Sequence, residues 1–185
     1  MLNAYDQSVG LFIRGLTNLG RQLAKAEEHA AASDSNEAAF LGARIAASPR
    51  GPNDASFAPR DVHLYSLADQ VHWAAEGARL AVAHLLGARA VPEASDARSF
   101  ATLHRRIDAT ISYLREVAPG EIEAGLERTI VIEHPRGSIS ATGSQFLLAF
   151  AIPHFFYHLT TAYGIFRNQG VQLTMGDFLG NWAAS

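Results

Sequence analysis

Residues 146–166 have the sequence FLLAFAIPHFFYHLTTAYGIF, which is 21 residues without a single Asp, Glu, Lys or Arg. Such a stretch is long enough to cross a hydrocarbon layer of about 30 Å. It carries two histidines, two threonines and two tyrosines, however, with Pro153 in its middle and only Arg167 flanking it closely. The charge asymmetry that orients a membrane helix is therefore missing. We expect no membrane span here but the central helix of a bundle, buried on most sides.

This helix has clear start and stop signals. Thr142-Gly143-Ser144-Gln145 has the pattern of a capping box, in which the first and last side chains satisfy each other's backbone N–H groups. The helix is expected to continue to Asn168, because Gly170 is typical of a helix end.

Three further segments have apolar residues at alternating spacings of three and four, the pattern of a helix with one buried face. They span about 5–32, 62–86 and 99–117, and Gly87 and Pro119-Gly120 are expected to end the second and third of them. Ser35 or Asn36 is expected to cap a shorter helix that runs through Ala47.

The segment between the third and fourth long helices changes period. Residues 129–134, TIVIEH, are rich in β-branched side chains, Pro135-Arg136-Gly137 can turn, and residues 138–141 can pair back. Because two strands alone are marginally stable in water, the hairpin must pack on the helices. The sequence thus predicts an all-α fold, an antiparallel four-helix bundle with a small β-hairpin between helices 3 and 4. A chain of 185 residues suits a single domain, residues 1–185.

Composition and charge exclude several classes of protein. Hydrophobic residues make up 48% of the chain and the net charge is −3, which is unlike a disordered chain. No basic stripe is available to neutralise phosphates, so we expect no nucleic-acid partner. The chain has no cysteine, which excludes disulfides, thiolate metal sites and cysteine nucleophiles. The first residues lack a basic segment followed by an apolar run, so we expect a cytoplasmic protein.

The most loop-like stretch is residues 48–60, which holds three prolines, a glycine and an Asn-Asp pair. A loop of about a dozen residues inside a compact domain is long enough to act as a lid. A plain solvated connector explains the same composition, and the sequence leaves both interpretations open.

Two histidines on the uncharged helix stand out. His154 and His158 are four residues apart and therefore share one helix face. Two imidazoles so placed can both reach one metal ion through bonds of about 2.0–2.1 Å. Buried histidines on such a helix must be hydrogen-bonded, face a pocket or bind a metal. Pro153 removes the backbone hydrogen bond to Ala149 and can kink the helix where a pocket would open.

A stable, open metal site needs a third ligand, and His72 on the second long helix is the best candidate. Glu76 follows one turn later and could orient an imidazole or act as a base. Alternatively, Asp69, His72, Glu76 and Arg79 form a solvated polar face with local ion pairs, and spacing alone leaves both possibilities open. Trp73 and Trp182 are expected to be packing residues. The remaining histidines are expected at the surface: His29, His63, His84, His104 and His134.

Several segments together are similar to a known family. They are Tyr5-Asp6, Leu67–Val71, Phe150–Pro153, Phe156–Tyr163 and Gly176–Gly180, which cover nearly the whole chain. On these residues, and on the histidines of the second and last long helices, the chain resembles the DinB/YfiT-like bundle superfamily, and more narrowly the branch catalogued as domain of unknown function 1993.

The resemblance implies a bundle fold, often as a homodimer. It places the superfamily's three metal-ligand positions on His72, His154 and His158. Members of the superfamily are regarded as metal-dependent proteins, and some are transferases for low-molecular-weight thiols such as bacillithiol or mycothiol.

Two classes of function are compatible with these residues. In the first, His72, His154 and His158 hold Zn²⁺, Ni²⁺ or Fe²⁺ in a metal-dependent enzyme of the small-thiol transferase or hydrolase type, and Glu76 holds a histidine or moves a proton. In the second, the same histidines line an apolar pocket with Tyr157 in a non-catalytic protein that binds a small molecule or is purely a dimeric structural protein, without metal. The sequence does not decide whether the chain is an enzyme.

Overall fold

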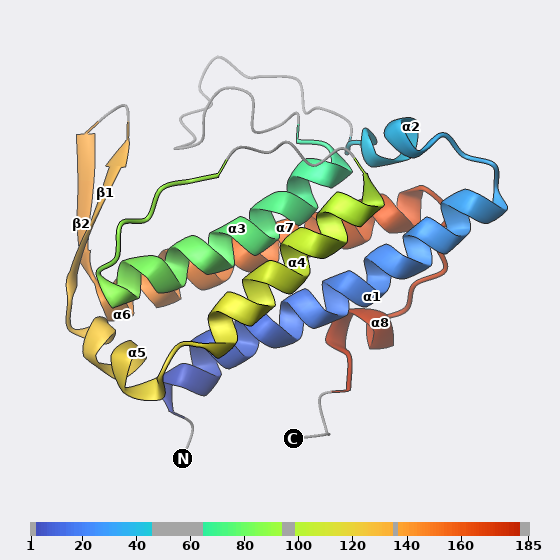
Figure 1. Cartoon of the computed structure of the whole chain (residues 1–185). Helices are drawn as coiled ribbons and strands as arrows, with labels where there is room; N and C mark the ends of the chain where they lie inside the picture. The colour runs from blue at the N-terminus through green and yellow to red at the C-terminus, as the bar shows by residue number, and fades with distance from the viewer. Residues whose placement is uncertain (1–2, 46–64, 94–98, 135–136, 182–185) are drawn as a thin grey trace.

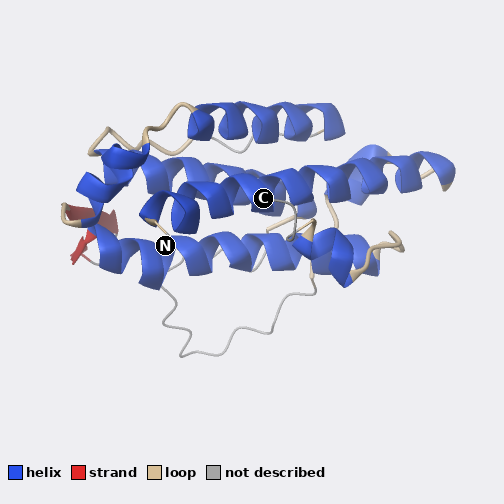
Figure 2. Cartoon of the chain, turned by 90° about the horizontal axis from the view of Figure 1, so that it is seen from below, coloured by secondary structure: helices blue, strands red, loops and turns tan. Residues whose placement is uncertain are grey.

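The structure, a computed structural model, describes residues 3–45, 65–93, 99–134 and 137–181. Four long helices lie side by side with a two-stranded sheet at one end (Figures 1 and 2). This confirms the predicted helical bundle with a small hairpin. The long helices are α1 (Leu11–Ala32), α3 (Leu67–Leu86), α4 (Phe100–Arg115) and α7 (Ile152–Asn168).

The directions of the four helices do not simply alternate along the chain. α3 packs against both α4 and α7, and α1 also packs against α4 and α7. Figure 1 shows that α3 and α4 run the same way, and that the described residues after α3, up to residue 93, turn back along the bundle. α1 and α7 run in the opposite direction. The α3–α7 pair, which carries the histidines, is therefore antiparallel.

The beginning of α3 is fixed by a capping box at Ser66. The Ser66 hydroxyl accepts from the backbone N–H of Asp69 at 3.2 Å, and the Asp69 carboxylate accepts from the Ser66 N–H at 3.0 Å. The predicted start near Val62 is therefore wrong for the described part of the chain, in which Tyr65 and Ser66 are not helical. The predicted end is confirmed, since Gly87 adopts a left-handed conformation with φ of 68°.

Short helices at the ends of the bundle differ from the prediction. α2 (Glu37–Leu41) has the expected Asn36 cap but ends by Gly42 rather than at Ala47. Pro119 does not simply end a helix, because it occupies the first turn of α5 (Pro119–Leu126), where its missing N–H costs nothing. α8 (Met175–Leu179) was not predicted either; Asn18 and Gln22 of α1 donate to its backbone carbonyls, each at 3.1 Å.

The hairpin pairs β1 (Thr129–His134) with β2 (Gly137–Thr142) in antiparallel register. Ile130, opposite Ala141, is buried and joins the core of the bundle. The hairpin thus packs against the helices as expected, and β1 lies close to the start of the last helix.

The last long helix is built from three consecutive pieces. α6 (Gly143–Phe146) begins at the predicted capping box of Thr142 and Gln145, the π-helical segment η3 (Leu147–Ala151) follows, and α7 then continues to Asn168. A second π-helical turn, η1 (Asp6–Gly10), precedes α1. The wide turn of η3 ends just before Pro153, which cannot donate a backbone hydrogen bond. The π-helical turn η3 leads directly into the part of α7 that carries the histidines and packs against α3.

The uncharged helix is less buried than the sequence suggested. Its inner face is buried, and Phe155 packs edge-on against Phe12 of α1 with ring centroids 4.9 Å apart. Its outer side is exposed, with Phe156 36% and Tyr157 51% accessible. The expectation of burial on most sides is therefore wrong for this chain, because within the described residues α7 packs mainly against α3 and α1. None of the described helices has the length and apolar character needed to span a membrane.

Candidate functional site

The candidate site is a chain of three polar side chains between α3 and α7. His154 and His158 lie on one face of α7, and their Nε2 atoms are 3.3 Å apart. On the other side of His158, its Nδ1 atom lies 2.7 Å from Oε1 of Gln70 on α3. Both His158 and Gln70 are almost completely buried, at 2% and 3% accessible. The predicted pair is thus brought together, and its buried end is held by an amide that the sequence analysis did not single out.

Burial keeps both imidazoles neutral. It lowers the pKa of His158 to about 3, with smaller contributions from the neighbouring His154 and His72. Burial also lowers the pKa of His154. At neutral pH each ring therefore carries one N–H donor and one nitrogen acceptor.

The hydrogen bonds then fix where each proton lies. The Gln70 oxygen can only accept, so Nδ1 of His158 is the donor and its Nε2 is an acceptor. The Nε2 of His154 must consequently donate to it. This leaves Nδ1 of His154 as the one ring nitrogen of the pair with a free lone pair. Gly77 of α3 lies beside this atom, and a Cβ at position 77 would stand only 3.0 Å from it.

His154 forms part of the wall of an apolar cavity of about 430 Å³. The cavity lies between α3, the beginning of the last helix and β1, and Glu133 is the only charged residue among its described lining. Its volume is in the range of small-molecule sites. Aromatic rings make up much of the wall: Trp73, His84, Phe146, Phe150 and His154.

His84 is a second histidine of this cavity, although the sequence placed it at the surface. It is half-buried, its ring meets Phe146 edge-on at 5.4 Å, and burial lowers its pKa. Trp73 packs as expected and also forms part of the cavity wall. The positions of Gln70, Gly77 and His84 at intervals of seven on α3 are the sequence signal that could have found this face.

His72 is not brought to the pair. It is two residues from Gln70, about 200° around the helix axis, and lies toward α4, where Arg106 and the Glu93 backbone affect its pKa. It is nevertheless close enough to His158 to lower the pKa of that ring. It is completely buried, its ring contacts Trp73 edge-on at 5.0 Å, and no hydrogen bond of normal geometry reaches its nitrogens within the described residues, where only the Glu93 backbone comes near. Across the described parts of the chain, no three His, Asp or Glu side chains are placed to hold one metal ion. The three-histidine metal site stays a prediction.

Glu76 also faces α4 and is engaged by an ion pair. Its carboxylate accepts from Arg79 at 2.9 and 2.7 Å and from the backbone N–H of Glu93 at 2.7 Å. Burial acts to raise the pKa of Glu76, but the bonds from Arg79 and Glu93 outweigh it and hold the pKa below its usual value. The predicted polar face of α3 does contain its local ion pair, yet Glu76 is buried rather than solvated.

Other residues singled out in the sequence either contact neighbouring parts of the fold or lie outside the described residues. A ring nitrogen of His29 is 3.1 Å from the Gln169 carbonyl oxygen, and His104 is 3.3 Å from the Glu27 carboxylate. The stretch 48–60, His63 and Trp182 lie outside the described residues.

Comparison with known proteins agrees with this architecture. The structure is similar to the crystal structure of a DinB family member protein from Shewanella denitrificans, with a TM-score of 0.79 and 31% sequence identity over 95% of this chain and 91% of that one. The fold is thus that of a DinB-type helical bundle. More particularly, residues 4–179 match the model of the domain of unknown function DUF1993, and the chain belongs to that family. The search of curated proteins finds no match.

Acid is expected to lower the stability of the fold through His158. Its folded pKa is about 3, whereas a histidine in the unfolded chain titrates near about 6.5. The unfolded state therefore binds the extra proton between these values. The stabilisation from neutral His158 is complete above the unfolded pKa and is lost as the pH falls toward about 3, at no more than about 1.4 kcal/mol per pH unit.

Urea unfolding of the natural chain and of His158→Gln, measured from neutral pH down to about pH 4, checks this expectation. His158→Gln should lose less unfolding free energy per pH unit than the natural chain. The control His104→Gln, at an exposed ion pair, should lose as much per pH unit as the natural chain. Equal slopes for the natural chain and His158→Gln would contradict it.

Proposed function

We propose that this chain binds a small, largely apolar molecule in the cavity beside His154, whose Nδ1 accepts a hydrogen bond from the ligand. The observation that carries the proposal is the ordered chain from Gln70 through His158 to His154, which leaves Nδ1 of His154 without a partner in the pair while His154 forms part of the cavity wall. His154 is only partly buried, so a ligand that donates to this nitrogen is expected to gain one ordinary net hydrogen bond.

The cavity walls limit the chemistry of the ligand. No Arg or Lys is among the described lining residues, and Glu133 supplies a negative charge. An anionic molecule is disfavoured, whereas a neutral or cationic molecule with an aromatic or aliphatic body is favoured. The polar group must be a donor, such as a hydroxyl, an amine or a thiol. If His154 accepts the proton of a hydroxyl or thiol group, it could also act as the general base in hydrolysis or thiol transfer.

A second candidate is a divalent-metal site at the same pair. The 3.3 Å between the two Nε2 atoms fits two bonds of about 2.0–2.1 Å to one ion. His158 is already oriented for this role, because its Nδ1 donates to Gln70 and its Nε2 carries a lone pair. His154 would have to place its proton on Nδ1 instead. A bound Zn²⁺, Ni²⁺ or Fe²⁺ would lower the pKa of a coordinated water or thiol.

Binding of phenol, compared with anisole, tests the first candidate. The two probes have similar rings, but only phenol has a donor. We expect phenol to bind about fivefold more tightly, since one net hydrogen bond contributes about 1 kcal/mol. The preference should vanish in His154→Phe, which keeps an aromatic ring without an acceptor, and persist in His104→Phe. Titration followed by NMR shifts of the cavity residues measures both affinities; a preference equal in all three proteins would overturn the proposal.

Metal content, measured by mass spectrometry on protein purified without a nickel column, tests the second candidate. A metal site at the pair predicts near one equivalent in the natural chain, lost in His154→Ala and in His158→Ala. His72→Ala should keep the metal, because among the described residues His72 is not placed to hold one ion together with the pair. Loss of metal in His72→Ala as well would instead support the three-histidine site. Absence of metal after incubation with Zn²⁺, Ni²⁺ and Fe²⁺ would exclude both sites.

We also propose that a second copy of the chain covers the outer face of α7. This face presents Pro153, Phe156, Tyr157, Thr160 and Gly164 without a charge, and nothing lies within 4 Å of a Cβ added at Gly164. Light scattering should give a dimer for the natural chain and a monomer for Thr160→Arg, since two arginines would meet in the interface. Glu28→Arg, on the exposed side of α1, should remain dimeric. A monomeric natural chain would contradict this arrangement.

A further inference from the structure

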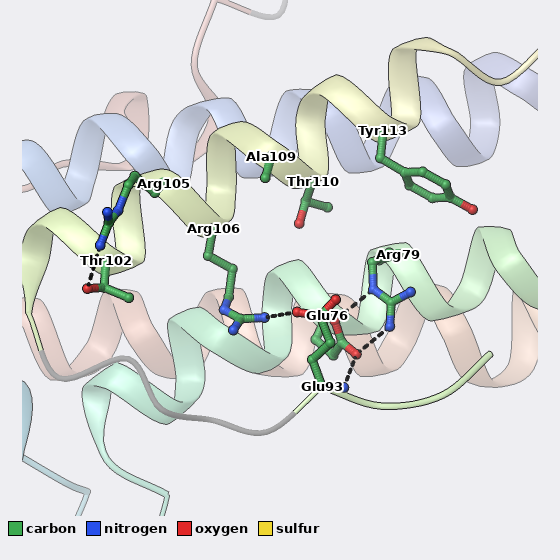
Figure 3. A pocket seen from close by; sticks show the side chains of 9 residues that line it. All are labelled: Glu76, Arg79, Glu93, Thr102, Arg105, Arg106, Ala109, Thr110 and Tyr113. Atoms are coloured by element: carbon green, nitrogen blue, oxygen red, sulfur yellow. Dashed lines mark hydrogen bonds and ion pairs between the residues drawn. The ribbon is translucent and has the colours of Figure 1, made fainter.

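The cavity beside His154, here called the histidine cavity, differs from a second cavity in how its polar groups are engaged. The second cavity, of about 470 Å³, lies between α3 and α4 and has a charged described lining (Figure 3). Arg79 binds the Glu76 carboxylate at 2.9 and 2.7 Å, and Arg106 lies 3.1 Å from the Glu93 carboxylate. These four charged groups are paired within the protein, whereas the histidine cavity borders backbone groups that have no partner in the fold.

These backbone groups belong to the free edge of β1. Within the described residues the sheet has two strands, so β1 pairs on one side only. Because only two residues separate His134 from Gly137, this pair must exchange both of its backbone hydrogen bonds. Such pairs alternate along an antiparallel ladder, and Ile132 is therefore the next hydrogen-bonded residue of β1. Val131 and Glu133 consequently direct their N–H and C=O groups away from β2.

The free edge of β1 lies along the histidine cavity. Val131, Ile132 and Glu133 all line this cavity, although the side chains of consecutive strand residues point to opposite faces. A cavity borders three consecutive residues of a strand when it lies along the strand's edge. No hydrogen bond from the described residues reaches the outward backbone groups of Val131 or Glu133. The cavity therefore has two unused donors and two unused acceptors at this edge.

The other walls of the cavity limit what can pair with this edge. Trp73 and His84 of α3 line the same space, as do Ala90 and Pro92 of the segment after α3. The volume of about 430 Å³ is in the range of small-ligand sites. A single extended segment needs only the spacing of one strand, about 4.8 Å. The edge strand of a second folded copy would instead bring the rest of its sheet against these walls.

We propose that the ligand of the histidine cavity is a short extended peptide segment, which adds to β1 as a third strand. The proposal rests on the proposed function, since the same cavity takes the ligand, and it names the class of that ligand. The main chain of the segment bonds to the outward N–H and C=O groups of Val131 and Glu133. In this mode of recognition the main-chain bonds supply affinity, and alternate side chains supply specificity.

The pleat of β1 determines where the middle side chain of the segment lies. A residue placed beside Ile132 points its side chain to the same face of the sheet as Ile132. Ile132 packs against the core of the bundle, so this face is turned toward the helices. Phe146, Phe150 and His154 line the cavity there. The middle residue therefore needs a largely apolar side chain, and the hydroxyl of a tyrosine supplies the donor for Nδ1 of His154.

Titration with the blocked peptide acetyl-Val-Tyr-Val-amide, followed by NMR of ¹⁵N-labelled protein, tests the proposal. The peptide should shift the amide signals of Val131, Glu133 and Gly77. It should bind at least about fivefold more tightly than 4-methylphenol, which is its tyrosine side chain alone, because one net backbone hydrogen bond contributes about 1 kcal/mol. The same peptide with all its amides N-methylated cannot donate to β1 and should bind no more tightly than 4-methylphenol.

Proline at the free edge tests the role of β1 itself. Val131→Pro and Glu133→Pro each remove one outward N–H but no hydrogen bond to β2, and proline is tolerated at such edge positions. Each should weaken binding of the peptide about fivefold. Ser140→Pro makes the same change on the outer edge of β2, outside the described cavity lining, and should leave binding unchanged. The dispersion of the NMR spectrum checks that each variant is folded, and the N-methylated peptide tests the same bonds in the natural chain.

Failure of this proposal can be distinguished from failure of the proposed function. If the peptide binds no more tightly than 4-methylphenol, or if all three proline variants bind it like the natural chain, the peptide proposal is overturned, whatever the preference for phenol over anisole. If binding depends on β1 but replacement of the tyrosine by phenylalanine in the peptide costs no affinity, the acceptor role of His154 is overturned and the peptide proposal stands.

Discussion

The hydrogen bond between His158 and Gln70 is the constraint on which the site depends. An imidazole buried between two packed helices destabilises the fold unless its polar atoms are satisfied. Gln70 satisfies one nitrogen at 2.7 Å, and His154 satisfies the other at 3.3 Å. The register between α3 and α7 therefore determines which atom of the pair is left for a ligand. A shift of either helix by one residue would separate these partners.

The two sides of α3 have different chemistry, and this difference organises the molecule. On the side toward α7, Gln70 binds His158, and positions 77 and 84 border an apolar cavity. On the side toward α4, positions 72, 76 and 79 meet buried charges. Both sides are buried in part, because α3 packs against α4 as well as α7. A single helix thus supplies walls to two cavities, one with a mostly apolar described lining and one with a charged described lining.

Much of the fold follows from periodicity in the sequence. The four long helices, the hairpin and the capping box at Thr142 could be predicted because each depends on local patterns. The short helices α5 and α8 could not, since they are stabilised by contacts distant in sequence, such as the bonds from Asn18 and Gln22 to α8. The exposure of α7 was also missed, because hydrophobicity alone does not say how many neighbours a helix has.

Only the part of the site that lies on a single helix, the histidine pair, could be predicted from the sequence. The spacing of His154 and His158 on one helix was sufficient to bring them together. The hydrogen-bond partner of His158 on α3 depends on how α3 faces α7, which the sequence of α3 does not reveal, so Gln70 could not be singled out from the sequence. Glu76 was expected to act with a histidine, but Arg79 three residues later on the same helix holds its carboxylate.

The most direct test of this account is the protonation of the two imidazoles, measured by ¹⁵N NMR of the histidine side chains at neutral pH. The account predicts that His158 carries its proton on Nδ1 and His154 on Nε2, with the Nδ1 of His154 unprotonated. Substitution of Gln70 by Leu should remove the preference at His158. A proton on Nε2 of His158, or a charged imidazole at either position, would contradict the proposed chain of hydrogen bonds.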